Sequence, residues 1–241
     1  MKERMKALIT MGDPAGIGAE IIVKALAHKE VYERCIPVVI GDGAALRDAL
    51  EFCGSELVLR EIGSPGEARG CPGTIDLIDL KLLKKGDWNY KENSAVCGEA
   101  SFRYVTEGIR LAMEKQGAAV ITAPISKESL RMAGIHYDGH TEIFAKYTNT
   151  EKFAMLLAGG GLHVIHVSAH CSLREACERV KKGRVYEVIR LAQRGMQELG
   201  YERPRIAVAG LNPHSSENGL FGEEEEKEII PAIEKAREEG L

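Results

Sequence analysis

Short apolar runs alternate with longer amphipathic stretches along the chain, which predicts strands followed by helices. In the first part, apolar runs at Lys6–Thr10 and Ile36–Gly41 precede helical patterns at Ala19–Ala27 and Ala44–Cys53. Repeated alternation of this kind is typical of an α/β fold built on a parallel sheet. The expected fold class is therefore α/β.

The middle of the chain is less regular but returns to the same alternation. Glycine and proline interrupt the stretch from Glu56 to Lys91, which favours connecting or edge structure. Further elements are expected as a strand at Thr74–Asp79, a long helix at Ser94–Lys115 and a buried strand at Ala118–Thr122. Pro124 ends that last run, so we expect two domains, an N-terminal α/β domain at 1–121 and a second, incomplete α/β domain at 122–241.

The second half repeats the pattern. Strands are expected at Phe153–Ala158, Leu162–Ser168 and Arg205–Ala209, and helices at Leu173–Val180, Val185–Leu199 and Glu223–Glu239. Arg205–Ala209 is β-branched and apolar enough to predict a buried parallel strand. Ligands of open α/β sheets bind outside the carboxyl ends of such strands, which directs attention to the residues that follow.

Composition and charge narrow the class of protein. The 241 residues are 44% hydrophobic and 28% charged, as in ordinary globular proteins, and the net charge of -4 provides no basic field for nucleic acid. No apolar run reaches the length of a membrane span, and the first residues lack a signal peptide's apolar region, so a cytoplasmic location is expected. The six cysteines are scattered without a CxxC pair, which favours reduced thiols.

Two histidines follow two predicted strands and are the strongest candidates for chemistry. His170 comes after the Leu162–Ser168 run, and His214 comes after Arg205–Ala209 within Asn-Pro-His. Neutral imidazoles are common ligands of zinc and similar divalent ions, although a histidine at a strand end is also often purely structural. His166 would share a face with His170 in an extended strand and compete for the same ion, while Cys171 is a weaker candidate because adjacent side chains point apart.

Three other segments combine a turn with polar groups before a helix. Thr10–Glu20 is a glycine-rich turn whose helix amides could hold an anion, but it lacks the G-x-G-x-x-G spacing, and a tight turn without ligand is the favoured interpretation. Ser126 and Lys127 follow Pro124 and suit either a phosphate or a capping turn. His140 and Thr141 suit an anionic or polyhydroxy substrate, with a capping role for Thr141 as the alternative.

The acidic run from Glu223 to Glu226 has a simple interpretation. Carboxylates in the first turn of a helix interact favourably with the helix dipole. We therefore expect a solvated face there instead of a metal site.

Five segments in the same order resemble the PdxA family of 4-hydroxythreonine-4-phosphate dehydrogenases. They are MGDPAGIGAE, TAPISK, GHTEIFA, VSAHCSLREA and GLNPHSSENG. The resemblance implies the isocitrate/isopropylmalate-dehydrogenase type of α/β fold, with two domains around a cleft and a homodimer that shares its active sites. It also implies metal binding by His170 and His214 and substrate binding by His140 and Thr141, without identifying a general base.

The implied reaction is the NAD-dependent oxidation, with NADP as a second possibility, of a secondary alcohol in a phosphorylated four-carbon hydroxy acid, followed by decarboxylation. A divalent zinc, magnesium or cobalt ion would assist it. In the biosynthetic branch the substrate is 4-hydroxythreonine 4-phosphate, used to make pyridoxal 5'-phosphate. Ser172, at a position where that branch more usually has proline, resembles the branch that acts on D-threonate or D-erythronate 4-phosphate.

One departure from the family keeps other functions open. Family members continue beyond the position of Leu241 into a segment with a third metal-binding histidine, so this chain is expected to lack that segment. The alternatives are an inactive remnant that binds a phosphorylated ligand, or a phosphate acyltransferase of related fold. Fold analogy alone does not decide between these functions.

Overall fold

The structure is a computed structural model that describes residues 4–241 and divides the chain into two units. The first unit ends at Thr150 and the second spans Glu151–Leu241, so the division falls later than the expected boundary after residue 121. The reason is that helices α5 (Lys127–Met132) and α6 (His140–Tyr147) both pack against helix α4 (Ala95–Met113) of the first unit. The chain after strand β5 (Ala119–Thr122) therefore stays with the first unit for two more helices.

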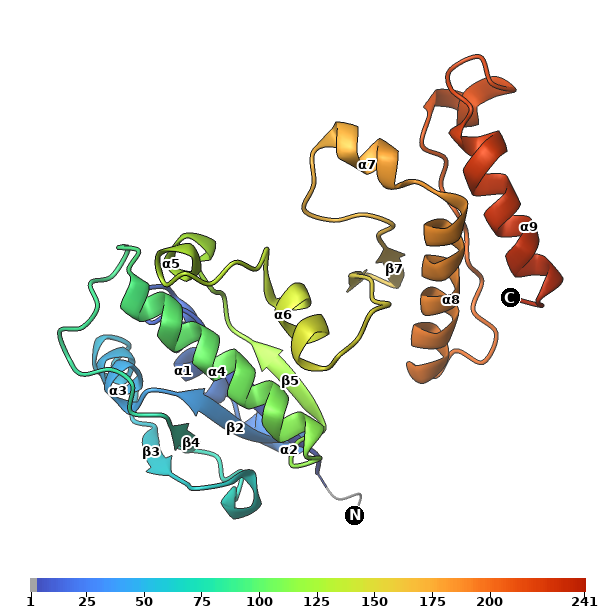
Figure 1. Cartoon of the computed structure of the whole chain (residues 1–241). Helices are drawn as coiled ribbons and strands as arrows, with labels where there is room; N and C mark the ends of the chain where they lie inside the picture. The colour runs from blue at the N-terminus through green and yellow to red at the C-terminus, as the bar shows by residue number, and fades with distance from the viewer. Residues whose placement is uncertain (1–3) are drawn as a thin grey trace. The chain divides into compact units, whose positions relative to one another are not determined.

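A five-stranded parallel sheet forms the centre of the first unit, as expected (Figure 1). Its strand order is β3 (Val58–Glu61), β4 (Thr74–Asp79), β2 (Ile36–Gly41), β1 (Lys6–Thr10) and β5 (Ala119–Thr122). Leu8 of β1 lies opposite Val38 on one side and Val120 on the other. The side chains of β2 are buried along nearly the whole strand, as is typical of a parallel strand covered on both faces.

Helices cover the sheet and position its carboxyl edge. They are α1 (Gly18–Leu26), α2 (Lys29–Arg34), α3 (Gly43–Phe52) and α4, with a short 3-10 turn η1 (Pro65–Glu67). The side chain of Ser94 caps α4 by accepting a hydrogen bond from the backbone N–H of Cys97 at 3.2 Å. The long helix α4 contacts β1, β2 and β5, and it crosses the near face of the sheet in Figure 1.

The second unit has a different architecture from the one expected. Strands β6 (Leu156–Gly159) and β7 (Leu162–Ile165) form an antiparallel hairpin around Gly160 and Gly161, whose φ angles are 55° and 81°. The helices are α7 (Leu173–Arg179), α8 (Lys182–Glu198) and α9 (Ile230–Glu238), with a 3-10 segment η2 (Pro213–Glu217) and a π turn η3 (Glu225–Ile229). The prediction of a parallel alternation in this half was wrong.

Arg184 explains why both hairpin strands are shorter than predicted. Its guanidinium donates one hydrogen bond to the carbonyl oxygen of Phe153 and another to that of Val167, each at 3.0 Å. These carbonyls thus bind a side chain instead of a neighbouring strand. Arg205–Ala209, predicted as a buried parallel strand, belongs to no ladder in the described residues and is a further correction.

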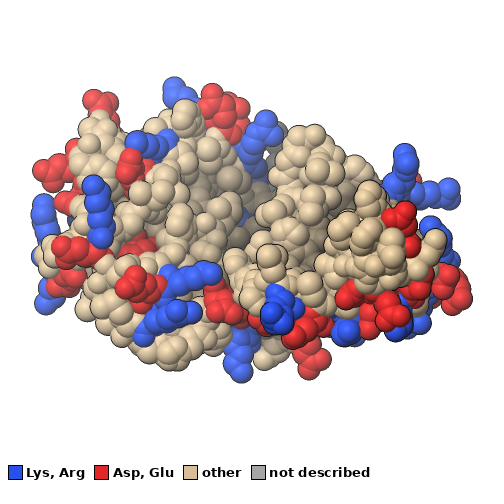
Figure 2. Space-filling view, turned by 90° about the horizontal axis from the view of Figure 1, so that it is seen from above, with Lys and Arg blue, Asp and Glu red and all other residues tan. Residues whose placement is uncertain are grey.

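Charged residues of both signs are interspersed over the face shown in Figure 2. This distribution agrees with the small net charge of the sequence. Among residues 4–241, no helix is long and apolar enough to cross a membrane.

Candidate functional site

The glycine-rich turn after β1 is held tightly by backbone contacts at the carboxyl edge of the sheet. The N–H of Asp13 donates to the carbonyl oxygen of Pro124 at 2.9 Å, and the buried carboxylate of Asp13 accepts from the N–H of Ala15 at 2.8 Å. A Cβ on Gly12 would lie 2.3 Å from Pro124 O, and one on Gly18 would lie 2.0 Å from a backbone oxygen. Close backbone packing therefore accounts for these glycines.

A buried carboxylate closes the carboxyl end of β2. One oxygen of Asp42 accepts from the hydroxyl of Tyr104 at 2.7 Å, and the other accepts from the N–H of Leu83 at 2.9 Å. Burial raises the pKa of Asp42, although its hydrogen bonds act in the opposite direction. Burial and the neighbouring Asp42 carboxylate also raise the pKa of Tyr104. The pair joins α4 to the sheet edge.

Ser126 and Lys127 take the positions of a helix start. The hydroxyl of Ser126 accepts from the N–H of Ser129 at 3.2 Å, so it caps α5, and it donates to Asn93 at 2.7 Å. The side chain of Lys127 is exposed and makes no hydrogen bond or ion pair within residues 4–241. The capping interpretation is confirmed for the serine, and the lysine offers an uncommitted positive charge.

His140 and Thr141 begin α6 without serving as its cap. The N-cap is Gly139, and no side chain caps the helix, so the alternative that Thr141 merely caps it is wrong. Both residues are half-buried. Nε2 of His140 and one carboxylate oxygen of Glu142 are buried without any hydrogen-bond partner among the described residues. Burial lowers the pKa of His140, which favours the neutral imidazole.

Unpaired buried polar atoms are uncommon, and they often mark places where a ligand or water completes the hydrogen bonding. The first turn of α6 therefore presents an imidazole nitrogen of His140 that has no partner among the described residues, beside the half-buried Thr141. Helix amides at such a position also favour an anion.

His170 and His214 both lie in loops of the second unit, with left-handed backbones and exposed side chains. Their φ angles are 52° and 54°. The strand that was expected to carry both His166 and His170 ends at Ile165, so the argument that these two share a strand face was wrong. His214 contacts the ring of Phe221 at a centroid distance of 5.9 Å.

The loop that carries His214 is strained over five residues. From His214 to Asn218 every φ lies between 47° and 65°, although none of these residues is glycine. A non-glycine residue in this region costs on the order of 1 kcal/mol or more, so surrounding contacts have to hold the loop in place.

Glu225 binds the residues that come just before this loop. Its carboxylate accepts from the N–H groups of Leu211 and Asn212 at 2.7 and 2.6 Å and from the side-chain amide of Asn212 at 2.8 Å. Burial would raise the pKa of Glu225, which is 3% exposed, but these hydrogen bonds outweigh burial and lower it. Only the neighbouring Glu223 and Glu226 are exposed, so the solvated face expected for the whole acidic run was wrong for Glu225. The sequence signal that could have identified this role of Glu225 was an acidic residue about a dozen positions after Leu211 and Asn212.

The side-chain chemistry of the two histidines suits a divalent ion, but two protein ligands are fewer than such an ion usually takes. Exposed imidazoles are suitable ligands, and neither His170 nor His214 makes a hydrogen bond within residues 4–241. However, no group of three or more His, Cys, Asp or Glu side chains in the described chain is placed to hold a metal ion. Catalytic zinc sites usually take three protein ligands, so further donors are needed.

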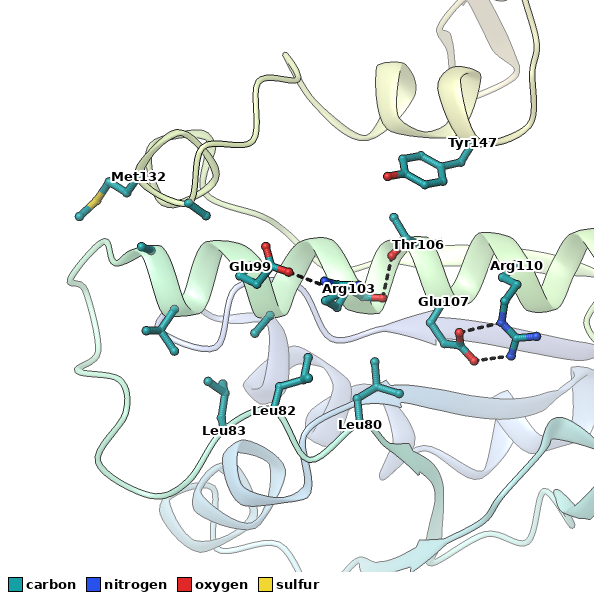
Figure 3. Close-up of a pocket in the computed structure, with 14 residues that line it drawn as sticks. Leu80, Leu82, Leu83, Glu99, Arg103, Thr106, Glu107, Arg110, Met132 and Tyr147 are labelled. Carbon is teal, nitrogen blue, oxygen red and sulfur yellow. Dashed lines mark hydrogen bonds and ion pairs between the residues drawn. The ribbon is translucent and has the colours of Figure 1, made fainter.

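A cavity in the first unit contains none of the candidate residues described above. It measures about 1030 Å³ and lies along α4 (Figure 3). Arg103 pairs with Glu99 at 2.7 Å and Arg110 with Glu107 at 2.6 Å, so its charged groups are paired locally. None of the predicted site residues lines it.

Comparison with known proteins gives consistent matches over almost the whole chain. A family model described as "Pyridoxal phosphate biosynthetic protein PdxA" matches residues 33–241. D-threonate 4-phosphate dehydrogenase of Cupriavidus necator is 46% identical over 233 residues, covering 96% of this chain and 70% of its own. A putative D-threonate 4-phosphate dehydrogenase of Clostridium botulinum is 42% identical over 232 residues, with coverage of 96% and 70%.

A solved structure gives the same result for the fold. The crystal structure of 4-hydroxythreonine-4-phosphate dehydrogenase from Klebsiella pneumoniae matches with a TM-score of 0.90 at 42% identity, covering 99% of this chain and 72% of that one. The α/β fold of the isocitrate/isopropylmalate-dehydrogenase type is thereby confirmed.

Proposed function

The chain belongs to the PdxA family, and from this premise we propose that it is a dehydrogenase that oxidises the secondary alcohol of a phosphorylated four-carbon hydroxy acid. D-threonate 4-phosphate is the first substrate to test, because the relative from Cupriavidus necator is named for it. 4-Hydroxythreonine 4-phosphate is the second, since the structure from Klebsiella pneumoniae is named for that compound. The second substrate would give the chain a role in pyridoxal 5'-phosphate biosynthesis.

One observation in the structure supports substrate binding at α6. Nε2 of His140 is buried without a partner, next to a half-buried Thr141 that has no capping role. A neutral imidazole and a hydroxyl can both hydrogen-bond to the oxygens of an anionic hydroxy acid. We assign these two side chains to orienting the substrate, which lowers the entropic part of the barrier.

His170 and His214 are the residues that would hold a divalent ion. When bound, such an ion would supply positive charge beside the reacting hydroxyl and make it more acidic. Glu225 holds Leu211 and Asn212, which lead into the five-residue left-handed loop that carries His214. The remaining ligands would come from substrate oxygens, water or groups outside these two side chains.

A nicotinamide cofactor would accept the hydride. The turn Thr10–Glu20 does not fit a dinucleotide cradle, because Gly12 and Gly18 lie against protein backbone. No residue is therefore assigned to the cofactor. By the same family resemblance we infer a homodimer, a cytoplasmic location, and NAD in preference to NADP.

The test is the formation of NADH by this chain with each substrate, in the presence of zinc or magnesium and then of a chelator. We expect metal-dependent turnover, a loss of at least tenfold in kcat/KM for His140→Ala, and little change for the exposed control His136→Ala. Equal activity of the two variants would remove His140 from the proposal. Folded protein without turnover on either substrate would contradict the activity itself.

Metal binding is tested separately by equilibrium dialysis with zinc. His170→Ala and His214→Ala should each abolish binding, whereas His166→Ala should leave it largely intact. Retention of zinc when both His170 and His214 are replaced would refute the assignment.

A further inference from the structure

A cavity of about 350 Å³ lies in the second unit between α8 and the segment that carries Lys152. None of the candidate site residues described above lines it. The lining residues from α8 recur every three or four positions, so they share one face of the helix, and the buried residues of α8 form the opposite face. That lining consists of Gly183, Tyr186, Glu187, Arg190, Leu191 and Arg194.

Positive side chains dominate the lining of this cavity. Lys152, Arg190 and Arg194 each bring a positive charge, and Glu187 is the single carboxylate among the described lining residues. Glu187 already pairs at 2.5 Å with Arg184, which lies outside the lining. The positive charge in the cavity is therefore not offset from within.

Neighbouring residues also leave this charge largely unpaired. The positions four residues before and four residues after Arg190 are Tyr186 and Arg194, and like charges one turn apart on a helix disfavour each other. Arg194 donates from Nε to Glu198 at 2.8 Å, but its two Nη groups donate no hydrogen bond within residues 4–241. The exposed side chain of Lys152 has no hydrogen bond or ion pair with any described residue.

Contacts with α9 hold the aromatic wall of the cavity in place. The hydroxyl of Tyr186 donates to the carboxylate of Glu239, and Nζ of Lys235 lies 4.1 Å from the centre of the Tyr186 ring. Cζ of Arg190 lies 5.9 Å from the centre of the same ring. Because these contacts order Tyr186, the guanidinium beside it loses less freedom when it binds a ligand.

The arrangement of the charges indicates the class of ligand. Guanidinium groups bind phosphate oxygens through paired N–H donors, and an ammonium group adds a point charge. Three cations from two segments suit a group with several charged oxygens better than a carboxylate, which has two. We propose that this cavity binds the phosphate group of a small anion, at a site built from residues other than those of the proposed substrate site.

The experiment titrates the full 241-residue chain with inorganic phosphate and, separately, with glycerol 3-phosphate at constant ionic strength. Amide signals are followed by nuclear magnetic resonance, since the proposed substrate also carries a phosphate and the readout has to resolve the site. We expect saturable shifts at the amides of Gly183, Arg190 and Leu191 with at least one of these anions. Tighter binding of the ester would identify the ligand as a phosphorylated compound, and equal binding would identify free phosphate.

Two kinds of variant separate a site in the cavity from general attraction to a basic surface. Arg190→Gln and Arg194→Gln should each raise the Kd at least fivefold, whereas the control Arg203→Gln, at an exposed position outside the cavity, should change it less than twofold. Gly183→Leu should abolish binding without altering the charge, because a Cβ at Gly183 would meet no atom within 4 Å and the side chain is free to fill the cavity. Leucine also favours a helix more than glycine does, so this variant is expected to fold.

Three results would overturn the proposal. They are the absence of saturable shifts at these amides with both anions, equal weakening by Arg203→Gln, and unchanged binding to Gly183→Leu. The last result would show that the anion is attracted to the basic surface without entering the cavity. Circular dichroism checks that each variant folds, and the titrations of the unaltered chain remain decisive if one variant does not.

Discussion

Replacement of Glu225 by glutamine tests whether this carboxylate holds Leu211 and Asn212, the residues that lead into the His214 loop. The wild-type carboxylate accepts three hydrogen bonds from Leu211 and Asn212 and is almost fully buried. Glutamine has nearly the same shape, but it carries no charge and turns one acceptor into a donor. The change therefore removes hydrogen bonding while leaving the packing nearly constant.

The expected loss follows from the strength of hydrogen bonds to a charged acceptor. Each is worth about 1.5–3 kcal/mol, and one such bond at minimum is lost or reversed. We expect local opening of the loop to become easier by about 2 kcal/mol. Since every 1.4 kcal/mol corresponds to a factor of ten, amide exchange at Leu211 and Asn212 should accelerate roughly 30-fold.

The pH dependence has a definite sign. The pKa of Glu225 is lowered in the folded chain relative to its ordinary value of 4.5. A carboxyl with a depressed folded pKa stabilises the structure above its unfolded pKa, and this contribution is lost as the pH falls through the folded value. The difference in exchange between wild type and Glu225→Gln should therefore be constant above about pH 4.5 and shrink below it.

Amide hydrogen exchange measured by nuclear magnetic resonance provides the assay, with Glu226→Gln as the matched control. Glu226 is exposed and adjacent, and it makes no hydrogen bond to the loop within the described residues. If Glu225→Gln accelerated exchange no more than Glu226→Gln, the reasoning that Glu225 fixes the loop would be refuted.

Two further predictions concern the first unit. Gly12→Ala should destabilise the chain by about 2 kcal/mol more than Gly134→Ala in urea unfolding followed by Trp88 fluorescence. The two glycines have similar φ angles of 76° and 75°, but only at Gly12 would an added Cβ meet backbone atoms. Equal losses of stability would contradict the close packing at Gly12. Tyr104→Phe should lower the free energy of unfolding by about 1–3 kcal/mol in the same assay, because it leaves one buried oxygen of Asp42 without its hydrogen-bond donor. An unchanged midpoint of the urea transition would show that this hydrogen bond does not stabilise the chain.

The first sheet was predictable from the sequence because local signals and long-range packing agree there. Lys6–Thr10, Ile36–Gly41 and Thr74–Asp79 begin and end where the apolar runs do. All three strands are largely buried, so a nearly continuous apolar run is the pattern that such a position requires.

The second unit was less predictable because decisive contacts join distant residues. The carbonyls that end its hairpin strands are bound by Arg184, and apolar periodicity does not reveal such a bond. Arg205–Ala209 has a strand's composition but no neighbour to pair with in the described chain. Glu225 looked like one of several acidic residues in a first turn, and only the fold shows that it turns inward.

The sequence proposes candidate site residues, but it does not predict their environment. Turn residues and resemblance selected His140, Thr141, His170 and His214 as candidates without information on burial. The unpaired nitrogen of His140 and the left-handed backbone of His214 depend on tertiary packing. Those two features came only from the structure.

The order of strands in the first sheet has a consequence for the newly made chain. Strand β1 pairs early with β2, where Lys6 lies opposite Ile36, but its other edge waits for β5, where Ala7 lies opposite Ala119. Pairings between residues so distant in sequence slow folding, and an unpaired edge invites misassembly in the meantime. On the ribosome, the first unit should therefore acquire protease resistance only after β5 has emerged, and chains stalled just after β4 should remain sensitive.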